Sequence, residues 1–119
     1  MVRIETEAAL EAALAQSVRE PILLFKHSTA CPVSHRAFEE VKRLSGGAFL
    51  GVPPIFVILA IENRPLSLAV AEILQIQHQS PQMILVDRGA ACWHGSHGGI
   101  TAKAVSEAVS GHVRQVQGA

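Results

Sequence analysis

The chain has 119 residues, of which 49% are hydrophobic and 17% charged. This length supports one hydrophobic core and leaves no room for two, so we expect a single domain over residues 1–119. Ten Lys and Arg balance ten Asp and Glu, which argues against the strongly basic surface of nucleic-acid-binding proteins. Acidic residues near the N-terminus argue against a secretory signal, and the longest apolar run, residues 48–61, is too short to span a membrane. We expect a cytoplasmic protein with no nucleic-acid or membrane partner.

The first part of the chain predicts a strand, a helix and a second strand. Apolar and charged residues alternate over residues 2–5, which predicts a short edge strand. Thr6 is placed to cap a helix over about residues 7–17. The unbroken apolar run at residues 22–25 is typical of a central strand that is covered on both faces.

The middle of the chain predicts two helices with a strand between them. Pro32 fits the first turn of a helix whose apolar face ends at Gly46-Gly47. A β-rich apolar run at residues 55–61 predicts another buried strand. Apolar residues then recur at helical spacing over residues 66–76, with Pro65 near the start.

The last part predicts a hairpin and a helix. The strands at residues 83–86 and 90–93 flank Gly89, which permits a tight turn. Thr101 is placed to cap the final amphipathic helix. The predicted order is therefore β-α-β-α-β-α-β-β-α. Strands joined by crossover helices pair in parallel and a hairpin pairs antiparallel, so this order indicates an α/β protein with a mixed sheet.

Cys31 falls between a predicted strand and the helix that begins at Pro32. Unpaired N–H groups and the positive end of the helix dipole favour a thiolate there, so we predict that Cys31 is a nucleophile. Ser34 stands where a dithiol site would carry its second Cys, with its hydroxyl and amide within expected reach of the sulfur. A mixed disulfide on Cys31 then has no internal thiol to resolve it, which indicates a monothiol mechanism. The alternative is a Cys that packs as a small buried residue.

Five groups of residues form an ordered set of motifs between about residues 21 and 109. They are Phe25-Lys26-His27-Ser28-Thr29 with Cys31-Pro32-Val33-Ser34, Ile61-Glu62-Asn63-Arg64-Pro65, His78-Gln79-Ser80-Pro81-Gln82, Trp93-His94-Gly95-Ser96-His97, and Ile100-Thr101-Ala102-Lys103. Together they resemble the monothiol bacilliredoxin family. Gln79 departs from the family pattern, which has an acidic residue there, and Cys92 stands in place of an aliphatic residue.

The resemblance implies a thioredoxin-like fold, a three-layer α/β/α sandwich with a mixed central sheet. It also implies a monothiol-disulfide oxidoreductase that removes bacillithiol, or a similar low-molecular-weight thiol, from mixed disulfides on cytoplasmic proteins. Cys31 would attack the mixed disulfide and take the small thiol onto itself. Another small thiol or a reductase would then release it. No cofactor is expected, because the small thiol is a co-substrate.

The resemblance also assigns supporting residues around Cys31 and Ser34. These are Thr29, Pro32, His27, Ser80, Pro81, His94 and His97. It implies a cis Ser80–Pro81 bond. It also places the loop after the fifth strand beside Cys31, so that His94 and His97 are candidates for proton handling. The alternative is that both histidines are structural or simply exposed.

Arg36 and Arg64 are candidates for binding the small thiol. Bacillithiol carries malate carboxylates, and the Arg fork is suited to binding a carboxylate. Solvated surface charge is otherwise the expected role of Lys26, Arg36 and Lys42.

Two other readings concern metals and sensing. The groups Cys92-x-His94-x2-His97 and His27-x3-Cys31-x3-His35 lack the paired spacing of a structural zinc site, so we expect no metal. An iron–sulfur cluster bridged by two copies of Cys31, as in monothiol glutaredoxins, and a thiol sensor without turnover are the alternatives to an enzyme. Cys92 lies about two strands from Cys31, so we expect no disulfide between them.

Overall fold

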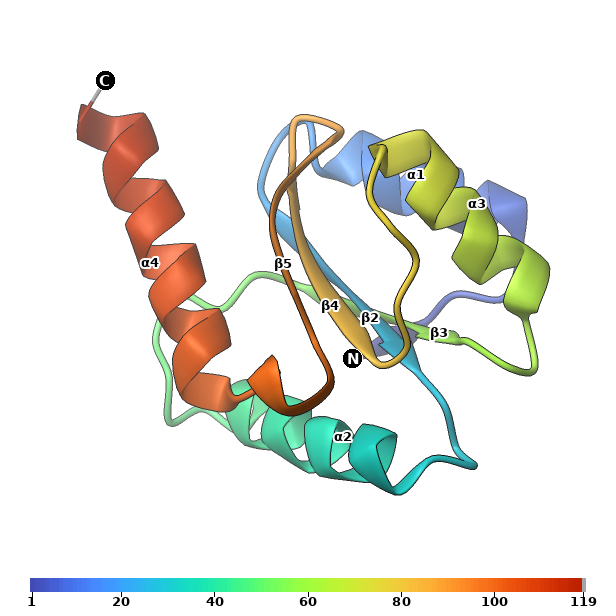
Figure 1. The fold of residues 1–119 in the computed structure, drawn as a ribbon. Helices are drawn as coiled ribbons and strands as arrows, with labels where there is room; N and C mark the ends of the chain where they lie inside the picture. The colour runs from blue at the N-terminus through green and yellow to red at the C-terminus, as the bar shows by residue number, and fades with distance from the viewer. Residues whose placement is uncertain (119) are drawn as a thin grey trace.

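A five-stranded sheet with strand order β1-β3-β2-β4-β5 forms the middle of the molecule in the computed structural model, which describes residues 1–118 (Figure 1). The strands are β1 (Val2–Arg3), β2 (Ile22–His27), β3 (Ile55–Leu59), β4 (Gln82–Asp87) and β5 (Ala90–Ser96). The helices are α1 (Glu7–Gln16), α2 (Pro32–Ser45), α3 (Arg64–Leu74), the short 3-10 helix η1 (His97–Gly99) and α4 (Ala102–Gly118). The predicted order of strands and α-helices is confirmed.

The sheet is mixed, and its directions bring β2 and β5 to the same end. Strands β1, β3 and β2 run parallel, while β4 pairs antiparallel with β2 and β5 antiparallel with β4. Strand β5 therefore runs parallel to β2 again. The C-terminal end of β5 and the following η1 therefore lie at the end of the sheet where the chain leaves β2 toward α2.

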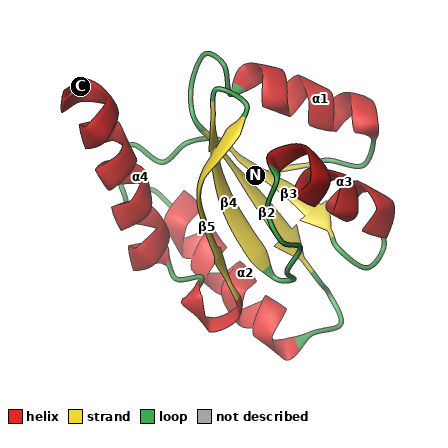
Figure 2. Cartoon of the chain, turned by 45° about the horizontal axis from the view of Figure 1, so that its top comes forward, coloured by secondary structure: helices red, strands yellow, loops and turns green. Residues whose placement is uncertain are grey.

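Helices cover both faces of the sheet, with α1 and α3 on one side and α2 and α4 on the other (Figure 2). Along β2, Leu23 and Phe25 belong to the core under α2 and α4, and Ile22 and Leu24 to the core under α1 and α3. All four are fully buried, which explains why the sequence needs an unbroken apolar run here. No helix in the described part of the chain has the length and apolar character to cross a membrane.

Three local predictions about helix caps and turns are confirmed. Thr6 Oγ1 accepts the Ala9 N–H at 3.1 Å, and Thr101 Oγ1 accepts the Ala104 N–H at 3.0 Å. The β4–β5 turn has positive φ at both Arg88 (54°) and Gly89 (74°), the combination found in the tight hairpin turns that favour Gly.

Strand β2 is longer than its apolar run, and this overturns one expectation. It continues through Lys26 to His27, and Lys26 pairs with Ile58 of β3 on one side and Gln82 of β4 on the other. Lys26 is 0% exposed, so the prediction of a solvated Lys26 is wrong. The reason is that β2 continues past its apolar run. At Lys26 it is still paired with β3 and β4, so this residue lies inside the sheet.

Candidate active site

Cys31 is the residue immediately before α2, in extended conformation, and it is half-buried. Its carbonyl accepts the His35 N–H at 3.0 Å, and its own N–H donates to the Ser28 carbonyl at 3.4 Å. Pro32 is the first residue of the helix. Among the described residues, no hydrogen bond reaches Cys31 Sγ. Cys31 thus immediately precedes a 14-residue helix, whose N-terminus carries a partial positive charge.

Ser34 lies in the first turn of α2 and is 0% exposed. The Ser28 N–H donates to Ser34 Oγ at 2.8 Å, and the same oxygen lies 2.8 Å from Nδ1 of His27. Because Oγ already accepts from Ser28, its own proton is available to a neutral His27. The hydroxyl therefore connects β2, the loop after it and α2, while no hydrogen bond joins it to Cys31 Sγ.

The His27 ring is packed among aromatic rings at the end of β2. It stacks on Phe38 at 4.7 Å between centroids and on Phe25 at 5.6 Å, and it meets His35 edge to face at 5.8 Å. Burial, followed by the charge of His35, lowers the pKa of His27, while Glu62 acts in the opposite direction. The neutral form is therefore favoured, and a neutral Nδ1 can accept the proton of Ser34.

Two contacts that sequence reasoning did not identify hold the loop between β2 and Cys31. His35 Nε2 lies 2.7 Å from the Thr29 carbonyl, and Thr29 Oγ1 donates to Glu62 Oε2 at 3.2 Å. His35 lies one helical turn after Cys31, and Glu62 belongs to one of the motifs of the sequence. Thr29 therefore connects the active-site loop to α2 and to the segment before α3.

The Ser80–Pro81 peptide bond is cis, as the resemblance implied. The Pro81 carbonyl accepts the His97 N–H at 3.1 Å, so the segment before β4 is hydrogen-bonded to η1. Pro81 is buried and Ser80 is half-buried, with no hydrogen-bond partner for Ser80 Oγ in the described part of the chain.

The loop before Pro81 contacts the buried side chain of Lys26. Lys26 Nζ lies 3.0 Å from His78 Nδ1, and the neighbouring Gln82 donates from Nε2 to the Gln77 carbonyl at 3.1 Å. Burial lowers the pKa of Lys26 to about 8. The pKa of His78 is lowered by burial and then by the charges of Lys26 and Arg64. Neither Lys26 nor His78 was identified by sequence reasoning as part of the site's support.

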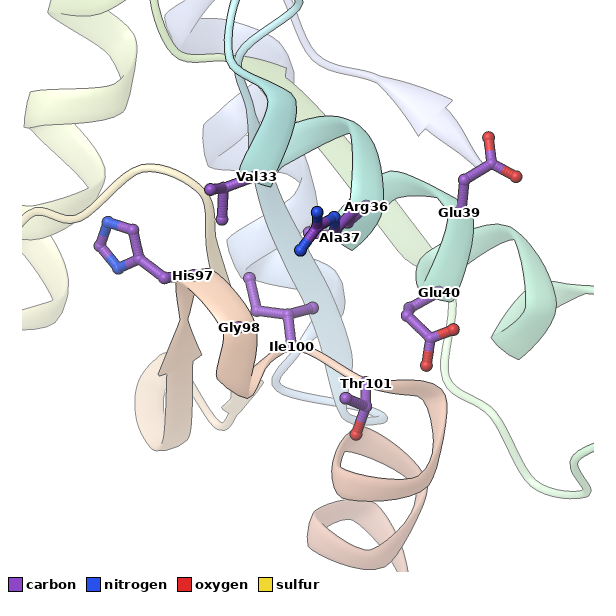
Figure 3. Close-up of a pocket in the computed structure, with 9 residues that line it drawn as sticks. All are labelled: Val33, Arg36, Ala37, Glu39, Glu40, His97, Gly98, Ile100 and Thr101. Atoms are coloured by element: carbon purple, nitrogen blue, oxygen red, sulfur yellow. The ribbon is translucent and has the colours of Figure 1, made fainter.

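A groove of about 620 Å³ runs between α2 and the η1 segment, beginning two residues after Cys31 (Figure 3). Val33 and Arg36 line it from α2, and His97 and Gly98 from η1. Figure 3 shows Arg36 and His97 on the two walls of this groove. The groove therefore offers an apolar side chain and a guanidinium from the first turns of α2, the helix that Cys31 precedes.

The structure separates the other predicted residues from this groove. Arg64 is exposed at the start of α3 and His94 is exposed within β5. His94 is paired with Ile84, whose side chain belongs to the core under α1 and α3, so His94 lies on the face opposite α2. Arg36 and His97 therefore line the same groove, whereas Arg64 and His94 do not line it.

Neither of the spacings considered for metal binding forms a cluster in residues 1–118, where the one group of three potential ligands is Asp87, Cys92 and His112. Both cysteines are free thiols, with Cys92 exposed on β5. A half-buried thiol at a helix N-terminus, with no second thiol in its first turn, can exchange with a disulfide but cannot resolve the product.

Solved structures with the same fold include a putative oxidoreductase with a thioredoxin fold, at 20% identity and a TM-score of 0.78, covering 90% of this chain and 91% of that one. Thioredoxin from Fasciola hepatica is 14% identical with a TM-score of 0.73, covering 94% of this chain and 99% of that one. Trxlp from Edwardsiella tarda EIB202 is 22% identical with a TM-score of 0.64, covering 90% and 96%. These likenesses show a thioredoxin fold.

The family described as monothiol bacilliredoxin BrxC matches residues 2–105. This range includes Cys31, Ser34, the cis-proline segment and both walls of the groove. The chain therefore belongs to the monothiol bacilliredoxin family.

Proposed function

We propose that the protein is a monothiol-disulfide oxidoreductase that removes bacillithiol, or a similar low-molecular-weight thiol, from mixed disulfides on cytoplasmic proteins. The observation that carries this proposal is the position of Cys31. Cys31 immediately precedes α2, and its sulfur has no hydrogen-bond partner among the described residues. The buried hydroxyl of Ser34 stands where a dithiol site would carry its second thiol. Family membership supports a thiol oxidoreductase role.

The reaction consists of two thiol–disulfide exchanges without net oxidation in either step. The Cys31 thiolate attacks the small-thiol sulfur of the mixed disulfide, the S–S bond between that sulfur and the target protein's cysteine breaks, and the target protein leaves as a thiolate that takes a proton from solvent. Cys31 now carries the small thiol as a disulfide. The thiolate of a second small thiol, or of a reductase, attacks the sulfur of the carried thiol; the S–S bond to Cys31 breaks, Cys31 leaves as a thiolate, and the carried thiol departs as a disulfide with its attacker.

The part of the groove lined by Val33 and Arg36 supports a small anionic thiol as the carried group, while Glu39 and Glu40, which line it further along α2, are paired with Lys42 and Arg43. Arg36 offers a guanidinium to a carboxylate, and Val33 offers an apolar contact. The malate carboxylates of bacillithiol match this donor. The reaction uses no resident cofactor, since the thiol itself is the co-substrate.

A release assay tests the proposal. A model protein carrying one bacillithiol disulfide is incubated with the protein and free bacillithiol, and the freed protein thiol is measured over time. The parent and Cys92→Ala are expected to accelerate release, and Cys31→Ser to leave only the rate of the uncatalysed reaction. Equal rates with the parent and with Cys31→Ser would contradict the proposal.

A further inference from the structure

Three potential metal ligands meet at the end of the sheet opposite Cys31. Asp87 ends β4, Cys92 lies near the start of β5, and His112 projects from α4. One ligand atom of each lies within 4.8 Å of the other two. His112 Nε2 and Asp87 Oδ2 are 2.8 Å apart, with side chains only 18% and 12% exposed. The mechanism at Cys31 uses none of them.

An irregularity in the sheet accounts for the position of Cys92. In the β4–β5 ladder Val86 pairs with Ala91 and Leu85 pairs with Trp93, so Cys92 is left without a partner. Ala91 packs on the core under α1 and α3, whereas Trp93 packs on the core under α2 and α4. Regular alternation would put both on one face. The extra residue at this bulge is Cys92, and a bulge redirects a side chain out of the regular pattern, here toward His112.

The three groups suit one cation. Thiolate, imidazole and carboxylate are the ligands that Zn²⁺ takes in proteins, at about 2.0–2.3 Å, and sites with three protein ligands leave a fourth position open. In tetrahedral geometry such ligands lie roughly 3.3–3.8 Å apart. A cation between Asp87 and His112, which are 2.8 Å apart, therefore requires their separation to grow by roughly 0.5–1 Å and the Cys92 sulfur, within 4.8 Å of both, to approach by up to roughly 1–1.5 Å.

A hollow of about 250 Å³ beside the cluster is lined by Asp87 and His112, and it gives room for a fourth ligand from solution. Arg19 and Arg88 line the same hollow. Their charges oppose a bare cation and favour an anionic fourth ligand, such as hydroxide or a small carboxylate.

We propose that Asp87, Cys92 and His112 form a Zn²⁺ site that links α4 to the β4–β5 hairpin. On binding, the Cys92 thiol loses its proton to solvent, and the proton between Asp87 and His112 leaves Nε2 for Nδ1 of the same ring or for solvent, so that the metal takes its place. No oxidation or reduction takes place. Because binding requires the folded arrangement of three separate elements, it stabilises the folded chain.

Metal titration of defined variants tests the site. The Cys31→Ser protein keeps Cys92 as its single thiol, and it is titrated with Co²⁺ and then with Zn²⁺. We expect one Co²⁺ per chain with a thiolate-to-metal charge-transfer band, displacement of Co²⁺ by Zn²⁺, and a rise in Tm with Zn²⁺. Cys92→Ser is expected to lose the band and the Tm shift, and His112→Gln to lose stoichiometric binding. His94→Gln, which alters an exposed histidine of the same strand, is the matched control and should bind like the parent.

Two outcomes would overturn the site. One is the absence of stoichiometric binding to Cys31→Ser at micromolar Co²⁺ or Zn²⁺. The other is a charge-transfer band that survives in Cys92→Ser and disappears in Cys31→Ser, which would place the metal at the active-site thiol. Thermal unfolding of each variant in chelator, with a Tm close to that of the parent, ensures that loss of binding is not loss of folding.

Discussion

Ser34 Oγ and His27 Nδ1 lie 2.8 Å apart in a buried position where β2 ends and α2 begins. The serine thus replaces a second thiol with a hydroxyl that already has two partners, the His27 ring and the Ser28 N–H. The active-site loop is fixed by a hydrogen bond that a dithiol site would not make. The same side chain therefore accounts for the absence of a resolving thiol and for a hydrogen bond to the loop after β2.

Replacing Ser34 by Ala should lower the free energy of unfolding by about 1–3 kcal/mol, because the buried Ser28 N–H and His27 Nδ1 lose their partner. Urea unfolding at pH 7 measures the change. Ser45→Ala, which removes an exposed hydroxyl bonded to the Lys42 carbonyl, should change stability by a few tenths of a kcal/mol. Similar losses in the two variants would show that the Ser34 bond contributes nothing.

Ser34→Cys should turn the site into a dithiol. With the small thiol on Cys31, the new thiolate at position 34 attacks the Cys31 sulfur, forms an intramolecular disulfide and expels the small thiol. Mass spectrometry should show loss of the adduct without added reductant, whereas Ser34→Ala retains it. An adduct that persists equally in both variants would mean that position 34 cannot reach Cys31.

Lys26 should make stability depend on pH above neutrality. Its pKa is about 8 in the folded chain against an ordinary value of 10.5, so between these values the unfolded chain binds the extra proton and stability rises with pH. The rise is about 3 kcal/mol across the window, at about 1.36 kcal/mol per pH unit. Lys26→Met should be more stable than the parent at pH 7 and lack this rise.

Chemical denaturation at pH 7 and at pH 9.5 measures the effect of Lys26. Lys103→Met serves as the control, because Lys103 is exposed on α4, and it should keep the pH dependence of the parent. If the free energy of unfolding changed with pH in the same way in Lys26→Met and Lys103→Met, Lys26 would not be the source of the pH dependence.

Arg36→Gln should raise the KM for a bacillithiol mixed disulfide about five- to tenfold with little change in kcat, because a hydrogen bond to a carboxylate is lost. Arg64 lies outside the groove, so Arg64→Gln should change KM less than about twofold. The parent, Arg36→Gln and Arg64→Gln should all have the same KM for a mixed disulfide with an uncharged small thiol. Equal effects of the two substitutions on the bacillithiol substrate would remove Arg36 from recognition.

Local sequence signals predicted most of the fold. The apolar run of β2, Pro32 at the start of α2, the Thr6 and Thr101 caps and the Gly89 turn each depend on neighbouring residues, and the structure shows all of them. The direction of β4 was not predicted by these local signals. Strand–helix–strand patterns favour parallel pairing, whereas β4 pairs antiparallel with β2 in the structure.

The supporting contacts of the site could not be predicted from local signals. Lys26 is buried because β4 and the loop before Pro81 cover it, and His78 lies 52 positions away in sequence. Glu62 likewise meets Thr29 through a contact between two loops. Spacing along the chain identified Cys31 and Ser34, but it carries no information about which distant side chains meet them.

A mass measurement of the transferred group tests directly whether Cys31 takes the small thiol from a mixed disulfide. Cys92→Ser protein is mixed with a protein carrying one bacillithiol disulfide, the reaction is stopped with acid, and intact masses and peptides are measured. We expect the Cys31 peptide to gain one bacillithiol as the target loses one, and the Cys31→Ser protein to gain none. A target that keeps its bacillithiol, or an adduct that forms on the Cys31→Ser protein, would contradict it.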